Sequence, residues 1–148
     1  MAAFRYSFQK VVDLKSSEKT QAEWMLSSAI GALAAEELSL EELRSKQQEW
    51  EEKLHMSSQT AVSLSELQVI QQYLDYIETC ITRKLNDVLH AQKAVEKGRL
   101  ILSGKMKDEK VWLKAKDHAR ERFQYAQQIK EQNELDELAS VRYMMSTP

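Results

Sequence analysis

The sequence of 148 residues contains few of the residues that interrupt helices or cross-link a chain. It has three glycines, one cysteine and one proline, and that proline is the last residue, Pro148. No proline therefore breaks a helix before that position. The single cysteine, Cys80, excludes an internal disulfide, and so few cysteines fit a reducing cytoplasm. We expect Cys80 to be a small, partly buried apolar residue beside a helix interface.

Long apolar runs are also missing, and so are motifs for catalysis, metals or nucleotides. No stretch approaches the length of a membrane span, and no signal-peptide pattern opens the chain. There is no phosphate-binding loop, no glycine-rich nucleotide fingerprint and no CxxC pair. His55, His90 and His118 are far apart and do not have the spacing of metal ligands, so we expect each to face solvent on a helix. We therefore expect a soluble protein with no membrane insertion, no metal, no cofactor and no enzymatic activity.

Charged residues, in contrast, are abundant. They make up 30% of the sequence, and Glu, Lys, Leu, Ala and Gln dominate, which is typical of long exposed helices. The net charge is −2, but thirteen lysines and arginines lie with only six acidic residues in the stretch 83–130. Two interpretations stay open for this stretch: ordinary solvated helix faces, or a basic region that docks on an acidic partner. Acidic residues interrupt the stretch and no recognition motif accompanies it, so nucleic-acid binding is not expected.

Apolar residues recur at heptad spacing over two long tracts. The first tract runs from about Phe8 to Leu54, and the second from about Leu67 to Ala126. Spacings of three and four alternate in both tracts, as they do at the a and d positions of a coiled coil. The predicted fold is therefore all-α: two long helices that form an antiparallel coiled-coil hairpin, as a single domain over residues 1–148.

A serine-rich break separates the two tracts. Residues 55–65 lose the heptad and gather Ser and Thr side chains, which compete with helical backbone hydrogen bonds. Ser63 and Glu66 have the spacing of a capping box, so the second helix is expected to start within 63–65. The predicted elements are a first helix over about 4–55, a turn over about 56–64, and a longer second helix over about 65–138. The end of the second helix should project beyond the first helix or be disordered.

A chain reversal near residue 60 pairs the two tracts with each other. Facing positions then have numbers that sum to about 120, and the two interior charged positions, Glu36 and Lys84, face each other. Gly98 faces Ala22, where small residues permit a close backbone approach. The predicted seam of the hairpin comprises Leu26, Leu33, Glu36, Leu40, Ile77, Ile81, Lys84, Val88 and Val95.

Toward the chain ends the predicted seam becomes polar. Lys15 faces Lys105, and Phe8 facing Trp112 restores one apolar contact. This end is expected to be the least stable, either as tolerated weakness or as a place where a partner binds. Four large apolar residues lie off the seam and favour a docking surface over packing at the flanks or self-association. These residues are Trp24, Leu38, Tyr73 and Tyr76.

Short motifs stand at both ends of the chain. The segment from Phe4 to Lys15 reads FRYSFQKVVDLK, and the segment from Asn133 to Ala139 reads NELDELA. The first resembles the aromatic start and Asp-Leu-Lys segment of the flagellar export protein FliJ, and the second resembles that family's Leu-Asp-Glu-x-Ala ending. The resemblance covers the whole chain. The stalk proteins of virulence injectisomes are similar in shape and stay as an alternative.

The resemblance to FliJ implies a non-enzymatic stalk and coupling component of flagellar type III export. Members of that family resemble the γ stalk of rotary ATPases, insert into the hexameric export ATPase FliI, contact the export gate protein FlhA, and in some cases interact with export chaperones. The implied location is the cytoplasm, at the cytoplasmic face of the cell membrane at the flagellar base. A generic coiled-coil scaffold or a prefoldin-like chaperone hairpin is the alternative function.

By analogy with the family, the two chain ends enter the ATPase ring and the hairpin end faces outward. The residues expected to bind the ring are Phe4, Tyr6, Phe8, Lys15, Lys105, Trp112, Lys116, Arg120, Arg122 and Phe123. The residues expected to contact the gate are Leu38, Trp50, Tyr73 and Tyr76.

Overall fold

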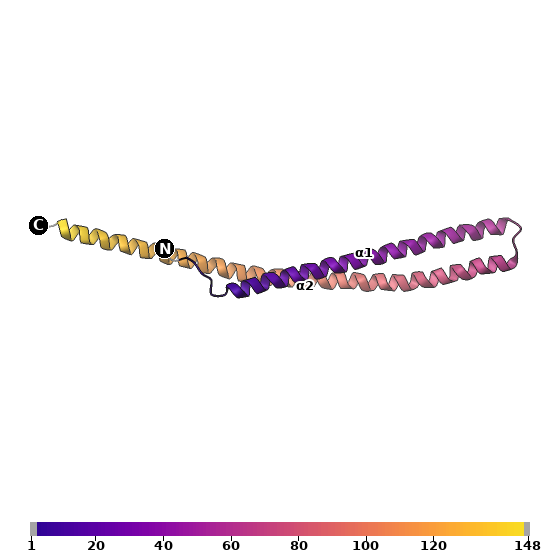
Figure 1. The fold of residues 1–148 in the computed structure, drawn as a ribbon, viewed down its shortest axis with the longest axis horizontal. Coiled ribbons are helices and arrows are strands. Elements are labelled where there is room, and N and C mark those ends of the chain that lie inside the picture. Colours follow the sequence, from indigo (N-terminus) through magenta and orange to yellow (C-terminus); the bar gives the residue numbers. More distant parts are fainter. Residues whose placement is uncertain (1–2, 147–148) are drawn as a thin grey trace. The chain divides into compact units, whose positions relative to one another are not determined.

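In the computed structural model, the described chain runs from residue 3 to residue 146 and forms two α-helices, α1 (Gln9–Gln59) and α2 (Leu64–Ser146) (Figure 1). No residue within 3–146 lies in a β-strand. The two helices pack against each other, so the all-α helical hairpin predicted from the heptads is confirmed.

The chain divides into two compact units. The turn unit is Gln21–Ser103, and the terminal unit is Met1–Thr20 together with Gly104–Pro148. The division falls at the positions where the seam changes from apolar to charged side chains. The seam of the turn unit is mainly apolar, whereas charged pairs are more frequent along the seam of the terminal unit.

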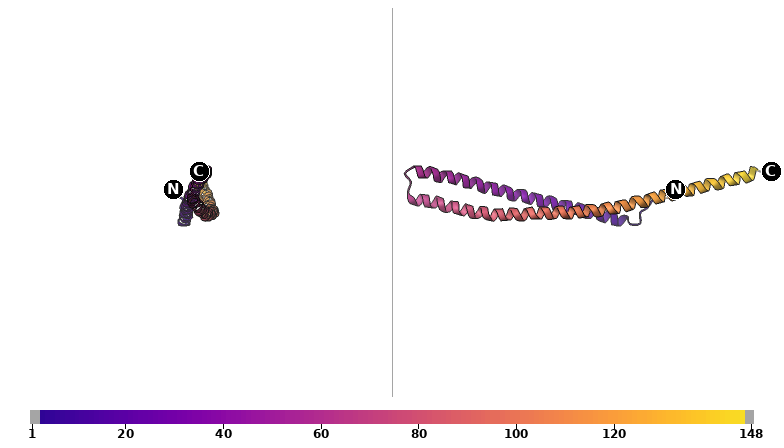
Figure 2. Two further views of the ribbon diagram at one scale, coloured as in Figure 1. Left: turned by 90° about the vertical axis from the view of Figure 1, so that its right-hand side faces the viewer. Right: turned by 180° about the vertical axis from the view of Figure 1, so that it is seen from behind.

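Within the turn unit, the core is a single line of side chains between α1 and α2. The two helices of this unit run side by side (Figures 1 and 2). Ile77 is the most enclosed side chain, with 2% of its surface exposed. The buried residues are Ala22, Leu40, Leu74, Ile77, Val88 and Val95. The half-buried residues along the same line include Leu26, Leu33 and Ile81. Every predicted seam residue of this unit therefore lies on the line between the helices.

The one charged pair predicted inside this seam is present. Lys84 Nζ donates a hydrogen bond to Glu36 Oε2 at 3.0 Å, and both side chains are about one-third exposed or less. The hydrogen bond to Glu36 raises the pKa of Lys84, which holds its ammonium group charged. Asp87 adds a longer contact to the same ammonium group, at 3.8 Å.

The two helices of the turn unit approach each other closely at Gly98, but the residue that Gly98 contacts on α1 is Leu26 and not the predicted Ala22. A Cβ atom on Gly98 would lie 3.3 Å from Leu26 Cδ1 and 3.6 Å from Leu26 Cα, and the nearest atoms do not include Ala22. In a coiled coil, each seam residue inserts between residues of the opposite helix and does not lie directly opposite one of them. A simple sum of residue numbers therefore predicts Ala22 as the neighbour of Gly98, whereas the contact is with Leu26, four residues later.

The end of α1 lies at Gln59, beyond the predicted end near residue 55. Ser58 Oγ donates to the carbonyl oxygen of His55 at 2.7 Å, and Thr60 Oγ1 donates to that of Met56 at 3.3 Å. These hydroxyl groups bond back to carbonyl groups one turn earlier in the chain. The serines expected to break the helix therefore lie within its last turn.

The start of α2 at Leu64 follows the capping signal in the sequence. Ser63 Oγ accepts a hydrogen bond from the Glu66 backbone N at 3.4 Å, and the carbonyl oxygen of Ser63 accepts one from Leu67 N at 3.3 Å. Ser63 is therefore the N-cap of α2. The turn that remains, residues 60–63, is shorter than the predicted 56–64.

In the terminal unit, α1 begins at Gln9 and not near Phe4. Residues 3–6 have no regular secondary structure, and the backbone turns at residues 7 and 8 before the helix starts. The carbonyl oxygen of Tyr6 accepts a hydrogen bond from Gln9 N within this turn, and that of Phe8 accepts hydrogen bonds from Val11 N and Val12 N, the first bonds of the helix. The predicted start of the helix near Phe4 was therefore wrong.

The other end of the terminal unit is the last part of α2. The helix continues to Ser146, past the predicted end at 138, and no other element runs beside its final residues (Figures 1 and 2). The last half-buried position is Gln127, while Ala126, the last residue of the predicted tract, is exposed. From residue 128 to 146 every residue is exposed. This stretch is named the bare end of α2.

Candidate functional site

An aromatic cluster attaches the non-helical segment 3–8 to α2 within the terminal unit. The ring of Phe4 lies 5.5 Å from that of Phe123, and the ring of Phe8 lies 6.0 Å from that of Trp112. Tyr6 bridges the two, at 6.5 Å from Phe4 and 5.8 Å from Phe8. These centroid distances are typical of favourable aromatic pairs. Five of the residues predicted to bind the ring therefore form one continuous cluster.

Basic side chains on α2 border this cluster. The guanidinium carbon of Arg120 lies 5.8 Å from the centroid of the Phe4 ring, within the range of a cation–π contact. Arg122 is exposed and Lys116 is half-buried. The three predicted basic residues on this part of α2 thus lie next to the cluster or close to it along the helix.

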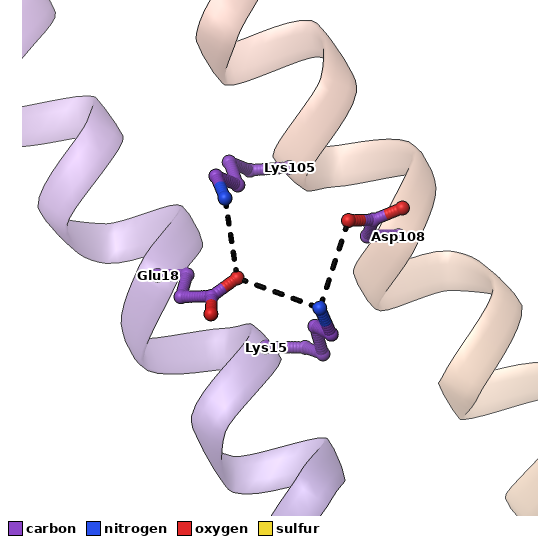
Figure 3. A network of polar contacts seen from close by, with 4 residues as sticks. All are labelled: Lys15, Glu18, Lys105 and Asp108. Atoms are coloured by element: carbon purple, nitrogen blue, oxygen red, sulfur yellow. Dashed lines mark hydrogen bonds and ion pairs between the residues drawn. The ribbon is translucent and has the colours of Figure 1, made fainter.

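The polar part of the terminal seam is a chain of alternating charges (Figure 3). Lys15 lies 3.7 Å from Glu18 and 3.8 Å from Asp108, and Lys105 lies 3.3 Å from the same Glu18. The two lysines predicted to face each other are therefore both neutralised. Each acidic residue stands three positions after a lysine, and each lysine contacts the acid of the opposite helix. The same spacing of three therefore occurs on both helices, once on α1 and once on α2.

A third interhelical ion pair follows along the same seam. Lys19 Nζ donates to Glu109 Oε1 at 3.0 Å, and the side chain of Glu109 is 14% exposed. A hydrogen bond from Ser16 and the one from Lys19 lower the pKa of Glu109. These paired charges thus fix which residues of α1 and α2 face each other at this end. Val12 is the buried apolar residue of the same seam.

A second aromatic cluster lies in the turn unit. The rings of Trp50 and Tyr73 are 4.4 Å apart, Tyr76 follows at 6.4 Å from Tyr73, and Lys53 Nζ lies 4.4 Å from the Trp50 ring. Three of the residues predicted to contact the gate therefore stand together. Leu38 does not join them, because it lies twelve residues before Trp50 on α1, about 18 Å along the helix axis.

Tyr76 is the exposed member of this second cluster. Its side chain is 62% exposed, and a hydrogen bond with Cys80 raises the pKa of its hydroxyl group. Cys80 is a free, half-buried cysteine, as expected. Tyr76 therefore presents a neutral hydroxyl group and a ring face to solvent at neutral pH.

The bare end of α2 is a candidate surface that the sequence analysis missed. Large apolar side chains are exposed along it, at 60% for Leu135, 61% for Leu138 and 72% for Tyr143. At 3.6 residues per turn, Tyr143 falls on the same face as Ile129, and Leu138 falls on the opposite face. The heptad pattern of the second tract indicates one apolar face, so it does not predict a second.

The described residues offer no site for a metal ion and no membrane-spanning helix. Within 3–146, no three His, Cys, Asp or Glu side chains are grouped so as to hold a metal ion. None of the helices described is both long enough and apolar enough to cross a membrane. The surfaces described above form the candidate site, and that of the terminal unit is the principal one.

The chain matches one family model over nearly its whole length. The family model of the flagellar FliJ protein matches residues 4–147. The chain belongs to the FliJ family. No curated protein matches it in sequence.

A solved structure supports the same fold. The protein described as a YscO homolog, CT670 from Chlamydia trachomatis, is 20% identical to this FliJ-family chain and superposes with a TM-score of 0.63. The match covers 98% of this chain and 100% of that chain. Membership of the FliJ family assigns the chain to flagellar type III protein export, as the motifs at its two ends predicted.

Proposed function

We propose that this FliJ-family protein is a non-catalytic coupling stalk. Its terminal unit binds within the ring of the export ATPase FliI, and its hairpin end contacts the export gate protein FlhA. Its place of action is the cytoplasmic face of the cell membrane at the flagellar base. The surfaces described above supply the physical grounds for each contact.

The observation that carries the proposal is the bare end of α2. A helix that is apolar on one face packs against one neighbour, whereas a helix that is apolar on opposite faces is stable when it is enclosed. The exposed apolar residues of this stretch occupy opposite faces, with Ile129 and Tyr143 on one and Leu138 and Val141 on the other. The central opening of a ring would enclose such a helix on all sides.

Charge supports the same contact. Between Gly104 and Arg122, α2 exposes lysines and arginines that no seam residue neutralises, among them Lys107, Lys110 and Lys114. Such a basic surface fits an acidic ring opening and accelerates association at low salt. The aromatic cluster around Phe4 holds residues 4–8 against this basic stretch.

Stimulation of ATP hydrolysis tests the ring contact. The purified export ATPase, at a concentration where the hexamer forms, should hydrolyse ATP faster when this protein is added. The double variant Lys114→Glu with Arg122→Glu should lose most of this stimulation, and a chain that ends at Gln127 should lose it as well. The matched control Arg44→Glu with Lys46→Glu carries the same charge change on α1 of the turn unit and should stimulate like the unaltered protein.

The outcomes separate the ring contact from a general scaffold. If the ATPase neither binds the protein nor changes its rate, the ring contact is wrong. Stable self-assembly of the protein without any effect on the ATPase would favour the coiled-coil scaffold. Loss of stimulation in the control variant as well as in the test variant would show that only overall charge matters.

The gate contact rests on the hairpin-end aromatic cluster. Tyrosine and tryptophan are enriched among the residues that carry binding energy at protein interfaces. Tyr76→Ala and Trp50→Ala should each weaken binding to the purified cytoplasmic domain of the gate by about tenfold. Trp24→Ala removes an aromatic side chain that is 72% exposed elsewhere on α1, and should leave that binding unchanged. Equal binding by all three variants would exclude the cluster as the contact.

A further inference from the structure

The hairpin end carries a second feature, next to the aromatic cluster, that the ring and gate contacts do not use. Surface hollows occur on both sides of Met56 and beside Ile70 in the turn unit. Met56 lines two of these hollows, and its side chain is 66% exposed. Ile70 lines one of them and also a third hollow, with Val69. Residues 48–57 of α1, without Trp50, and residues 65–70 of α2 are named the hairpin-end surface; Trp50 belongs to the aromatic cluster and lines none of these three hollows.

Carboxylate groups surround these apolar hollows. Glu49, Glu51, Glu52 and Glu66 all line them, and Lys53 is the only lysine or arginine on the hairpin-end surface. The result is an apolar floor with an acidic rim.

The single lysine does not neutralise this rim. Its ammonium group lies 3.8 Å from Glu49 and 4.4 Å from the Trp50 ring, so its charge is already engaged. Among the described residues, no ion pair engages Glu51, Glu52 or Glu66. Their negative charges are therefore available to a partner.

We propose that the hairpin-end surface binds a basic amphipathic helix of a partner protein. Apolar side chains of that helix would enter the hollows beside Met56 and Ile70, and its lysines or arginines would pair with the rim. An acidic rim repels anionic lipid surfaces and nucleic acids, so charge complementarity selects a basic polypeptide. The pairing of an apolar helix face with an apolar groove supplies most of the affinity in such complexes, and charge sets the partner. This inference does not depend on the gate contact, because it uses only the residues of this surface.

A designed peptide tests this chemistry on the full-length protein. The probe is a fluorescently labelled helix of about 18 residues, five turns long, with leucines on one face and lysines on the others. Its binding is measured by fluorescence anisotropy. Two further peptides serve as controls: one in which glutamates replace the lysines, and one of the same composition in an order that has no apolar face. Only the first peptide should bind, and it should bind less tightly as salt rises from about 0.05 M to about 0.5 M.

Two matched double variants locate the site. Glu49→Lys with Glu52→Lys reverses two rim charges and should weaken binding by on the order of tenfold. Glu37→Lys with Glu41→Lys makes the same charge change on the same helix outside the hollows, and should weaken it much less. Met56→Ser removes an exposed apolar side chain without touching the seam and should also weaken binding.

Three results would overturn the inference. The first is the absence of binding by the leucine–lysine peptide. The second is equal weakening by the two double variants, which would mean attraction to overall negative charge. The third is equal binding of the glutamate peptide, which would mean that the rim plays no part. Circular dichroism at 222 nm confirms that each variant keeps its helices.

Discussion

Gly98 offers the sharpest test of how closely the helices of the turn unit approach each other. Alanine is favoured over glycine inside a helix by about 1 kcal/mol. At Gly98, however, the added methyl group would lie 3.3 Å from Leu26 Cδ1 and 3.6 Å from Leu26 Cα. The Cδ1 atom can move by rotation of the side chain, whereas the backbone atom cannot. Adding a methyl group to a packed site costs typically about 1–3 kcal/mol, and the smaller value applies where one neighbour can yield.

At Gly98 the gain in helix propensity and the cost of the added methyl group nearly cancel, whereas at Gly31 only the gain applies. Gly31 lies inside the same helical unit, and a methyl group there would have no atom within 4 Å. Gly31→Ala should therefore stabilise the protein by about 1 kcal/mol, which raises the midpoint of thermal unfolding by roughly 3–5 °C. Gly98→Ala should leave the midpoint almost unchanged, and Gly98→Leu should lower it strongly because a longer side chain cannot fit beside Leu26.

Urea unfolding followed by circular dichroism at 222 nm gives the free energies for this comparison. The decisive quantity is the difference between the two alanine variants, since both share the same gain in helix propensity. If Gly98→Ala stabilises the protein as much as Gly31→Ala, the close approach to Leu26 is absent and the packing argument fails.

Three further predictions concern the seam. Ile77→Ala removes the most enclosed side chain and should lower the free energy of unfolding in urea by about 2–4 kcal/mol; a loss below 1 kcal/mol would mean that the seam is loosely packed. Glu36→Lys should destabilise the hairpin, and adding Lys84→Glu should restore part of the loss, whereas equal loss in the double variant would exclude their pairing. The folded-state pKa of Glu109 lies below its ordinary value of 4.5, so its contribution is present above that pH and is lost as the pH falls through the folded-state pKa. Unfolding in urea at pH 7 and below pH 4.5 should therefore show a smaller acid-induced loss for Glu109→Gln than for the unaltered protein.

The apolar part of the seam was predictable because a coiled coil repeats one simple rule. Spacings of three and four placed Leu40, Ile77 and Val88 on one line, and the structure buries all three. The pairing of Glu36 with Lys84 followed from the position of the turn alone. A repeating pattern constrains every residue at once, so an error at one position does not propagate.

The polar end was less predictable because its partners come from the flanks of the seam. Lys15 and Lys105 were expected to face each other as like charges, but Glu18 and Asp108 lie beside the seam and neutralise them. Long side chains reach across a helix interface, so a heptad line does not identify their partners. The serine-rich break has the same limit, since Ser58 lies inside the helix that was expected to end near residue 55.

The first aromatic residues show a different limit. The sequence predicts a helix from about Phe4, but residues 3–6 have no regular secondary structure and residues 7 and 8 form a turn. A short segment carries too few residues to establish a period, and its contacts with Phe123 and Trp112 lie far away in sequence. Here the tertiary contact, and not local propensity, decides the backbone conformation.

The short turn at residues 60–63 has a consequence for the order in which the hairpin forms. Contacts near this turn join residues close in sequence, whereas Glu36 and Lys84 are 48 residues apart and Lys19 and Glu109 are 90 apart. Closing a larger loop costs more chain entropy, so pairing should begin beside the turn and proceed toward the chain ends. During synthesis, Phe4 must wait until Phe123 has left the ribosome before the two rings can meet. The terminal unit is therefore the last part of the protein to be completed.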